Sequence, residues 1–397
     1  MNTPRQTLEI APELHWVGVK DWDRRMFDRL IPLPKGTSYN SYLLQGDHST
    51  ALIDTVNPGF EGELESKIRK YQDPETLDYV IMNHAEPDHA NGIEHILSVA
   101  PDARLLTSEK GQDMATSLFK IPEERIDAVE DEQTLDLGGK TVRFVDAPWL
   151  HWPETMFTFY EEEGILFSCD FFGAHIASSK FYADELGDAA LDHAKSYYGE
   201  IMMPYRPRAK AAMNKIEDFD INMIAPSHGL IHREVRPIIE AYRRWTEGQT
   251  KKKVLVPYIS MWGSTEKMAK TLIETIADEG IEVIPFNLAS GDLGRLAGEL
   301  VDAGGIIIGT PTVLAGPHPN AHHIAYLAKK LNPPAKYLGV IESHGWAGGA
   351  IREIADLVKG MKGEVVDTVS VLGTPTEEDL EKVVDFGREF AEQITSM

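Results

Sequence analysis

Short hydrophobic runs of the β type alternate with polar loops and helical stretches over the first 250 residues. The runs are rich in Val, Ile, Phe and Tyr and are short enough to be strands. They cover residues 41–45, 50–55, 78–83, 103–108, 141–147, 156–170 and 221–227. The run 156–170 reads as a hairpin whose turn is closed by Gly164. The pattern predicts a strand-rich first domain over residues 1–250.

The pattern changes near residue 248, where residues 248–253 read as a polar, basic connector. Strands of the buried type then alternate with helical segments, which favours a parallel sheet. These strands are expected at 254–260, 281–286, 304–311 and 336–343. The first helix is expected to begin near Ser264 and to end at Gly280, with one apolar face made of Met268, Leu272, Ile273 and Ile276. Five such repeats predict a small doubly wound sheet as a second domain over residues 251–397.

Composition excludes several classes of function. The net charge of -24 repels a phosphate backbone, so we expect no nucleic-acid partner. The sequence has no apolar stretch long enough to span a bilayer and no secretory signal at its start, so we expect no membrane partner and a cytoplasmic location. Cys169 is the only cysteine, which excludes an intrachain disulfide and a four-thiolate iron centre. Any iron must therefore be held by His, Asp and Glu.

Residues able to bind metal follow four separate strands. A dense cluster comes directly after the strand at 78–83, and single residues follow three later strands. The set is His84, Glu86, Asp88, His89, His151, Asp170 and His228. Each of the last three alone would be read as a turn residue, but the alternating charged cluster has no packing purpose. Together they provide enough ligands for two divalent ions at one sheet edge.

This set resembles a known family. The cluster His84-x-Glu86-x-Asp88-His89 is similar to the metallo-β-lactamase signature HxHxDH, with Glu86 in place of a histidine. A carboxylate there shifts the preference from zinc toward iron or manganese. This exchange, with the runs HWPET at His151 and APSHG at His228, resembles the flavodiiron proteins. The resemblance implies a metallo-β-lactamase-like αββα sandwich followed by a flavodoxin-like domain.

The resemblance also implies roles for individual residues. His84, Glu86 and His151 would ligate one iron, Asp88 and His228 would ligate the other, and Asp170 would bridge them. His89 would either ligate or be displaced by solvent. The segment KSYYGEIMMPY also resembles the family, and its Tyr197 and Tyr198 could donate a proton or hydrogen bond near the metals, although core packing is the default for both.

Three loops of the second domain resemble flavodoxin motifs and indicate an FMN site. The first, between strand and helix, has hydroxyls and Gly that suit a phosphate bound by neutral donors. In the third, Trp346 lies among glycines and is expected to stack on the flavin ring. The predicted contacts are Ser260, Met261, Trp262, Gly263, Ser264, Thr265, Pro311, Thr312, Val313, Leu314, Ala315, Gly316, Ser343, His344, Gly345, Trp346, Ala347 and Gly348.

By resemblance, FMN would pass electrons from an external donor to a di-iron site that reduces dioxygen to water or nitric oxide to nitrous oxide, a detoxification in an anaerobe. The donor would be a rubredoxin or a reduced deazaflavin, and the chain would form a head-to-tail homodimer or a dimer of dimers. The basic run Lys251, Lys252 and Lys253 is a candidate dock for an acidic donor, or a solvated linker.

Two other functions compete with this interpretation. A zinc-dependent hydrolase of the same superfamily would leave Glu86 and the flavin loops unexplained. A flavodoxin-like electron carrier with an inactive metal domain would leave the full ligand set unexplained.

Overall fold

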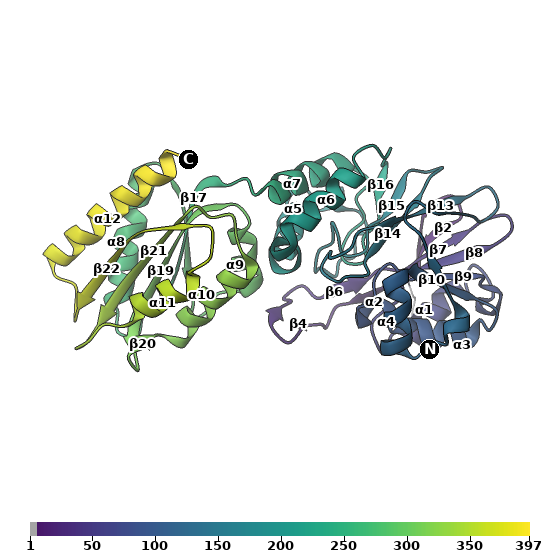
Figure 1. Cartoon of the computed structure of the whole chain (residues 1–397), viewed down its shortest axis with the longest axis horizontal. Helices are drawn as coiled ribbons and strands as arrows, with labels where there is room; N and C mark the ends of the chain where they lie inside the picture. Colours follow the sequence, from purple (N-terminus) through teal and green to yellow (C-terminus); the bar gives the residue numbers. More distant parts are fainter. Residues whose placement is uncertain (1–5) are drawn as a thin grey trace. The chain divides into compact units, whose positions relative to one another are not determined.

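The computed structural model describes residues 6–397, so the first five residues of the predicted first domain lie outside it. The described chain forms two compact units (Figure 1). The first contains the residues up to Tyr198 together with Pro207–Arg243, and the second contains Gly199–Arg206 and the chain from Arg244 onward. No helix among residues 6–397 is both long enough and apolar enough to cross a membrane.

A seven-stranded mixed sheet is the first layer of β structure in the first unit. Its order is β1 (Leu8–Ala11), β2 (Leu14–Trp16), β7 (Tyr42–Gln45), β8 (Thr50–Ile53), β9 (Tyr79–Ile81), β10 (Arg104–Ser108) and β11 (Ile126–Val129). The strands from β8 to β11 run parallel to one another, whereas β1, β2, β7 and β8 pair antiparallel. The parallel strands place their carboxyl ends at one edge.

The second sheet has five strands, and its hairpin is the one predicted from residues 156–170. Its order is β12 (Thr134–Asp136), β13 (Thr141–Asp146), β14 (Met156–Tyr160), β15 (Ile165–Phe167) and β16 (Met223–Ile224). Gly164 has φ +64° in the turn between β14 and β15, which explains the glycine. Two small antiparallel pairs complete the strands: β3 (Val19–Asp21) with β6 (Thr37–Tyr39), and β4 (Met26–Phe27) with β5 (Ile31–Pro32).

Two apolar cores define the layers of this unit. One core lies between the two sheets and joins residues such as Leu44 and Ile53 of the first to Phe144 and Phe167 of the second. The other covers the outer face of the first sheet, with Leu64 and Ile96 from its helices. The helices of this unit are α1 (Glu61–Ile68), α2 (Pro87–Ala90), α3 (Gly92–Val99), α4 (Glu109–Phe119), α5 (Asp188–Tyr197), α6 (Arg206–Lys215) and α7 (Val235–Glu247), the last of which runs into the second unit. The predicted αββα sandwich is confirmed.

The second unit is a doubly wound parallel sheet, as predicted. Its strand order is β18 (Glu282–Asn287), β17 (Lys251–Tyr258), β19 (Ala303–Val313), β21 (Tyr337–His344) and β22 (Glu364–Leu372), with β20 (Gly316–Pro317) paired to β19. Its helices are α8 (Ser264–Asp278), α9 (Leu293–Leu300), α10 (Pro319–Leu331), α11 (Ala350–Val358) and α12 (Glu377–Thr395). Helices α8 and α12 pack together on one face, and α10 and α11 pack together on the other (Figure 1). The flavodoxin-like fold is therefore confirmed.

The prediction of a polar, basic connector at residues 248–253 holds for residues 248–250, between α7 and β17, and is wrong for the three lysines. Strand β17 begins at Lys251, and Lys253 is buried with only 2% of its surface exposed. Its ammonium lies 2.8 Å from Glu299 Oε2 and forms a closer ion pair with Asp302. Asp302 also pairs with Lys251, at 3.2 Å. Two of the three lysines are therefore held by ion pairs within the second unit, which weakens the idea of a free basic dock.

Candidate functional site

The structure brings all seven predicted metal-binding residues into two adjoining groups. The first group is His84, Glu86, His151 and Asp170, whose ligand atoms lie within 4.8 Å of one another. His151 Nε2 is 3.1 Å from Glu86 Oε2 and 3.0 Å from Asp170 Oδ2, and 3.3 Å from His84 Nε2. Donor atoms that share one metal ion at about 2.1 Å lie roughly 3–3.5 Å apart, so this spacing fits a single ion.

The second group is Asp88, His89 and His228. His228 Nε2 lies 3.2 Å from Asp88 Oδ2 and 3.5 Å from Asp170 Oδ1. His89 Nε2 lies 2.9 Å from the same Asp170 oxygen. Asp170 therefore directs Oδ2 to the first group and Oδ1 to the second, as a bridging carboxylate would. His89, whose role the sequence left open, faces the second group.

The fold explains why these residues meet. His84 follows β9, His151 follows β13, Asp170 follows β15 and His228 follows β16, while Asp88 and His89 lie in the short helix α2. These strand ends belong to both sheets of the sandwich and converge at one edge of it. Loops on such a rigid frame are the usual place for a site.

Two buried carboxylates that the sequence analysis missed hold these loops. Glu154 Oε1 accepts hydrogen bonds from the backbone N–H of Ala85 at 2.8 Å and lies 2.7 Å from His84 Nδ1, which fixes the ring so that Nε2 faces the group. Asp54 accepts from the backbone and side-chain amides of Asn83, at 2.8 and 3.1 Å, and from Ser227 Oγ at 3.1 Å. The run HWPET contains Glu154, and Asp54 directly follows β8 within the predicted strand run 50–55, so both could have been suspected.

Electrostatics in the cluster are dominated by mutual pairing. Burial alone would lower the pKa of His84, but Glu154, Glu86 and Asp170 outweigh it and raise that pKa to about 10. The same balance raises the pKa of His151 to about 10 and of His89 to about 9. Burial would raise the pKa of Asp170, yet the facing imidazoles hold it well below its usual range. The carboxylates of the cluster therefore favour a positive charge between them, whether it is carried by the imidazoles or by a bound cation.

The donor set fits a pair of metal ions. Asp88 Oδ1, His89 Nε2 and Asp170 Oδ1 are buried, and although His89 Nε2 and Asp170 Oδ1 lie 2.9 Å apart, none of the three atoms makes a well-directed hydrogen bond within the described residues. Leaving such groups unpaired is costly, and a shared cation would satisfy them. Imidazole and carboxylate donors without thiolate suit iron or manganese. Burial raises the pKa of the nearby Cys169 thiol well above its ordinary value, which makes it a poor ligand.

Tyr197 and His175 adjoin the second group, whereas Tyr198 packs elsewhere. The His175 ring lies 4.8 Å from the Tyr197 ring and 4.9 Å from the His228 ring. Among the described residues, neither the Tyr197 hydroxyl nor His175 Nε2 has a hydrogen-bond partner. Tyr198 packs edge-on against Tyr242, at 5.3 Å. His175 was missed because a lone histidine in the loop after β15 carries no distinctive sequence signal.

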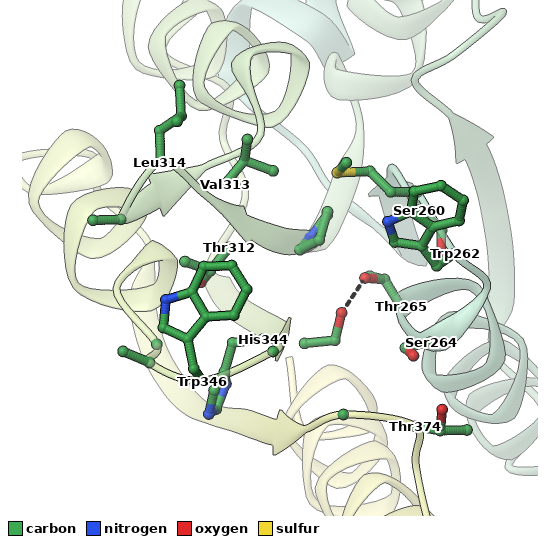
Figure 2. Close-up of a pocket in the computed structure, with 18 residues that line it drawn as sticks. Ser260, Trp262, Ser264, Thr265, Thr312, Val313, Leu314, His344, Trp346 and Thr374 are labelled. Atoms are coloured by element: carbon green, nitrogen blue, oxygen red, sulfur yellow. Dashed lines mark hydrogen bonds between the residues drawn. The ribbon is translucent and has the colours of Figure 1, made fainter.

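The second unit holds a cavity of about 560 Å³ at the carboxyl ends of its strands, within the size range of cofactor sites. Figure 2 shows Trp262 and Trp346 on different sides of it, and they are 90% and 93% exposed, respectively. The Thr265 and Ser343 hydroxyls lie 2.8 Å apart and join the first loop to the third. No lysine or arginine is among the described residues that line the cavity. A phosphate would therefore meet hydroxyls and the N-terminus of α8.

Sixteen of the predicted FMN contacts line this cavity, and two do not. Gly263 instead caps α8 with φ +91° and donates its N–H to Ser260 Oγ at 3.1 Å. Gly316 pairs with Val313 in the β19–β20 hairpin and is not among the residues that line the cavity. Gly373 and Thr374, which follow β22, also line the cavity, although no sequence motif indicated them.

Comparisons with known proteins agree with both units. Residues 37–229 match the ODP family beta lactamase, and residues 256–387 match the flavodoxin family. A nitric oxide reductase of Moorella thermoacetica is 36% identical and covers 98% of this chain and 99% of its own length. A coenzyme F420H(2) oxidase of Methanocaldococcus jannaschii is 34% identical and covers 98% of this chain and 97% of its own.

Solved structures give the same result. The rubredoxin oxygen:oxidoreductase of Desulfovibrio gigas superimposes with a TM-score of 0.95 at 32% identity, covering 98% of this chain and 99% of its own. The flavodiiron protein of Giardia intestinalis gives a TM-score of 0.95 at 29% identity, covering 100% and 98%. The chain therefore belongs to the flavodiiron proteins, which join a β-lactamase-like domain to a flavodoxin domain.

Proposed function

We propose that this protein is an FMN- and di-iron-dependent oxidoreductase that reduces dioxygen to water, nitric oxide to nitrous oxide, or both, with electrons from an external donor. The observation that carries the proposal is the pair of ligand groups joined through Asp170, with Glu86 in the first group, in a chain that also holds the flavin cavity. Relatives named for both gases are similar over nearly the whole chain.

His84, Glu86 and His151 would hold one iron, Asp88, His89 and His228 the other, and Asp170 both. When bound, the iron pair supplies electrons and a Lewis acid for a small diatomic molecule. The side chains orient and hold this pair: Glu154 fixes His84, and His228 Nδ1 lies 2.6 Å from the backbone carbonyl of Ser38. These outer contacts leave each Nε2 facing the cluster.

Reduction of either gas consumes protons, and the side chains of Tyr197 and His175 lie beside the second group. Burial raises the pKa of the Tyr197 hydroxyl well above its ordinary value, so it carries its proton. Burial lowers the pKa of His175 to about 3, so its ring is neutral. The hydroxyl of Tyr197 can donate a hydrogen bond to a substrate at the second group. Tyr198, committed to Tyr242, is assigned to packing.

The electron path is expected to run between two copies of the chain. Exposed apolar side chains occur on both units, which favours an interface. Met261, Trp262, Leu314 and Trp346 line the cavity, while Trp22, Met26 and Leu30 lie between β3 and β6 of the first unit and Trp149 lies in the loop after β13. Both segments adjoin the metal groups, because the Phe27 ring lies 4.6 Å from the His175 ring and Trp149 lies two residues before His151. A head-to-tail dimer, or a dimer of dimers, would cover both sets and bring one copy's flavin to the other's iron.

The external donor would be a rubredoxin or a reduced deazaflavin; one of the similar proteins is named for rubredoxin and another for coenzyme F420H(2). The cytoplasm remains the expected location, and a chain with one cysteine needs no oxidising compartment. The chain has no thiolate set of its own, so a donor with a cysteine-ligated iron must be a separate protein.

Metal and flavin analysis joined to gas uptake tests the proposal. Purified protein should contain about two iron atoms and one FMN per chain and should consume dioxygen or nitric oxide with a chemical reductant. A fully active preparation that contains only zinc would support a hydrolase. Bound FMN without gas consumption, in protein loaded with iron, would support an electron carrier.

A further inference from the structure

Glu342 is a buried carboxylate at the edge of the flavin cavity. It lies near the end of β21, just before Ser343, and only 2% of its surface is exposed. It lies beside Thr310 of β19 and Ser370 of β22 in the sheet register. Its carboxylate therefore sits where three neighbouring strands end and their loops begin.

The carboxylate collects donors from separate segments. Its Oε1 accepts a hydrogen bond from the Thr312 hydroxyl, and also from the backbone N–H groups of Gly349 at 2.8 Å and Ala350 at 3.0 Å. Its Oε2 accepts from the Ser370 hydroxyl at 3.3 Å. One side chain thus ties the end of β19, the start of α11 and β22 to β21. Donors at a helix start add a favourable dipole.

The two loops that carry most of the cavity wall close around this carboxylate. The third loop leaves β21 next to Glu342 and returns to it through Gly349, with Trp346 between. A Cβ at Gly348 would lie 3.1 Å from Glu342 Oε1, and one at Gly349 would lie 2.4 Å from the backbone oxygen of Ala315. The second and third loops are therefore in close contact, and Glu342 lies directly beneath them.

The carboxylate is charged at neutral pH. Burial alone would raise the pKa of Glu342, but the Thr312 hydroxyl and the N–H groups of Gly349 and Ala350 outweigh it and hold that pKa below its ordinary value. The cavity above it is lined, among the described residues, by no lysine or arginine. A buried negative charge of this kind acts at short range with little screening.

We propose that Glu342 is a positioning residue for the flavin: its carboxylate ties the loops 311–316 and 343–349 together, and its negative charge opposes electron addition to the ring bound between them. This inference rests on the assignment of the cavity to FMN. It concerns how the cavity is held and tuned, and it is independent of which gas the iron site reduces.

The test uses the full-length protein, stripped of FMN and titrated with FMN while flavin fluorescence is followed. Glu342→Ala removes all the hydrogen bonds that the carboxylate accepts and should weaken FMN binding about tenfold or more. Glu342→Gln retains an acceptor oxygen for Thr312 and the helix start but removes the charge. In a spectroelectrochemical titration of the holoprotein, its flavin midpoint potential should be more positive than that of the wild type.

Glu353→Gln is the matched control, because Glu353 lies on α11 with its side chain 46% exposed and close to Gly316. Glu353→Gln should change neither the affinity for FMN nor the midpoint potential of the flavin. Circular dichroism melting of each apo variant identifies a general loss of folding. A Glu342→Gln potential equal to that of the wild type overturns the inference, as does a Glu342→Ala variant that folds and binds FMN normally.

Trp346→Ala distinguishes a wrong inference about Glu342 from a wrong assignment of the cavity to FMN. If Trp346→Ala weakens FMN binding and Glu342→Ala does not, the inference about Glu342 is overturned while the cavity assignment stands. If neither variant changes FMN binding, the flavin binds elsewhere and both statements are overturned.

Discussion

Removal of the Glu154 carboxylate should weaken the first metal position without unfolding the domain. Glu154 is 2% exposed, and its Oε1 serves both the His84 imidazole and the Ala85 backbone N–H. In Glu154→Ala the His84 ring loses the partner that fixes its orientation, and a buried N–H is left without an acceptor. Glu154→Gln keeps an acceptor oxygen at both contacts and loses only the charge.

The size of the effect follows from these contacts. A hydrogen bond to a charged group contributes about 1.5–3 kcal/mol, and about 1.4 kcal/mol corresponds to a tenfold change in affinity. Glu154→Ala should therefore lower iron affinity at the first position about 10- to 100-fold, the range typical of partners behind metal-ligating histidines. Glu154→Gln should fall between this variant and the wild type.

Iron retention against a graded chelator, followed by iron analysis per chain, measures this affinity. Glu163→Ala, an exposed glutamate in the β14–β15 turn, is the control and should retain iron as the wild type does. Iron affinity in Glu154→Ala equal to that of the control would refute the reasoning, because the carboxylate would then have no part in orienting His84.

Three further predictions concern metal choice, folding and pH. Glu86→His restores the hydrolase-like cluster HxHxDH and should raise the zinc-to-iron ratio of purified protein with loss of gas reduction; unchanged iron loading would show that Glu86 does not set metal choice. Lys253→Met should lower the free energy of unfolding by about 1–3 kcal/mol, because it removes the buried cation that pairs with Asp302 and Glu299 and leaves Asp302 with the exposed Lys251, whereas the exposed Lys252→Met should change it little in the same denaturant titration. Because folding lowers the pKa of Glu342 below its ordinary value, its ionised carboxylate stabilises the folded protein at neutral pH, and this stabilisation is lost as the pH falls through the folded-state pKa. The difference in free energy of unfolding between wild type and Glu342→Gln should therefore become smaller in acid, and a difference that does not change with pH would contradict this.

The convergence of the candidate metal-binding residues could be predicted because strand ends in a sandwich with parallel strands share one edge. His84 and His228 each follow an apolar run that ends abruptly in polar residues, so pattern and position agree. The residues that hold these loops in place are harder to recognise in the sequence. Glu154 and Asp54 are single acidic residues in turns, and only the folded chain brings them to Ala85 and Ser227.

Long-range pairing also explains the error at the domain junction. Three consecutive lysines resemble a solvated connector, and local sequence does not reveal that Lys253 meets Glu299 and Asp302 from the next β/α segment. The same limit applies to Thr374, whose place in the cavity depends on where β22 joins the sheet. Local pattern identified the elements, while pairings across the sheet decided which polar side chains are buried.

Anaerobic stopped-flow mixing tests the central claim most directly. Fully reduced protein is mixed with dioxygen or with nitric oxide, and flavin absorbance is followed in wild type and in Asp170→Ala, which removes the carboxylate shared by both ligand groups. We expect rapid flavin reoxidation by at least one gas in the wild type, and slow reoxidation by that gas in a folded, FMN-loaded Asp170→Ala. Equal rates in the two proteins would contradict it, because the electrons would then reach the gas without the metal site.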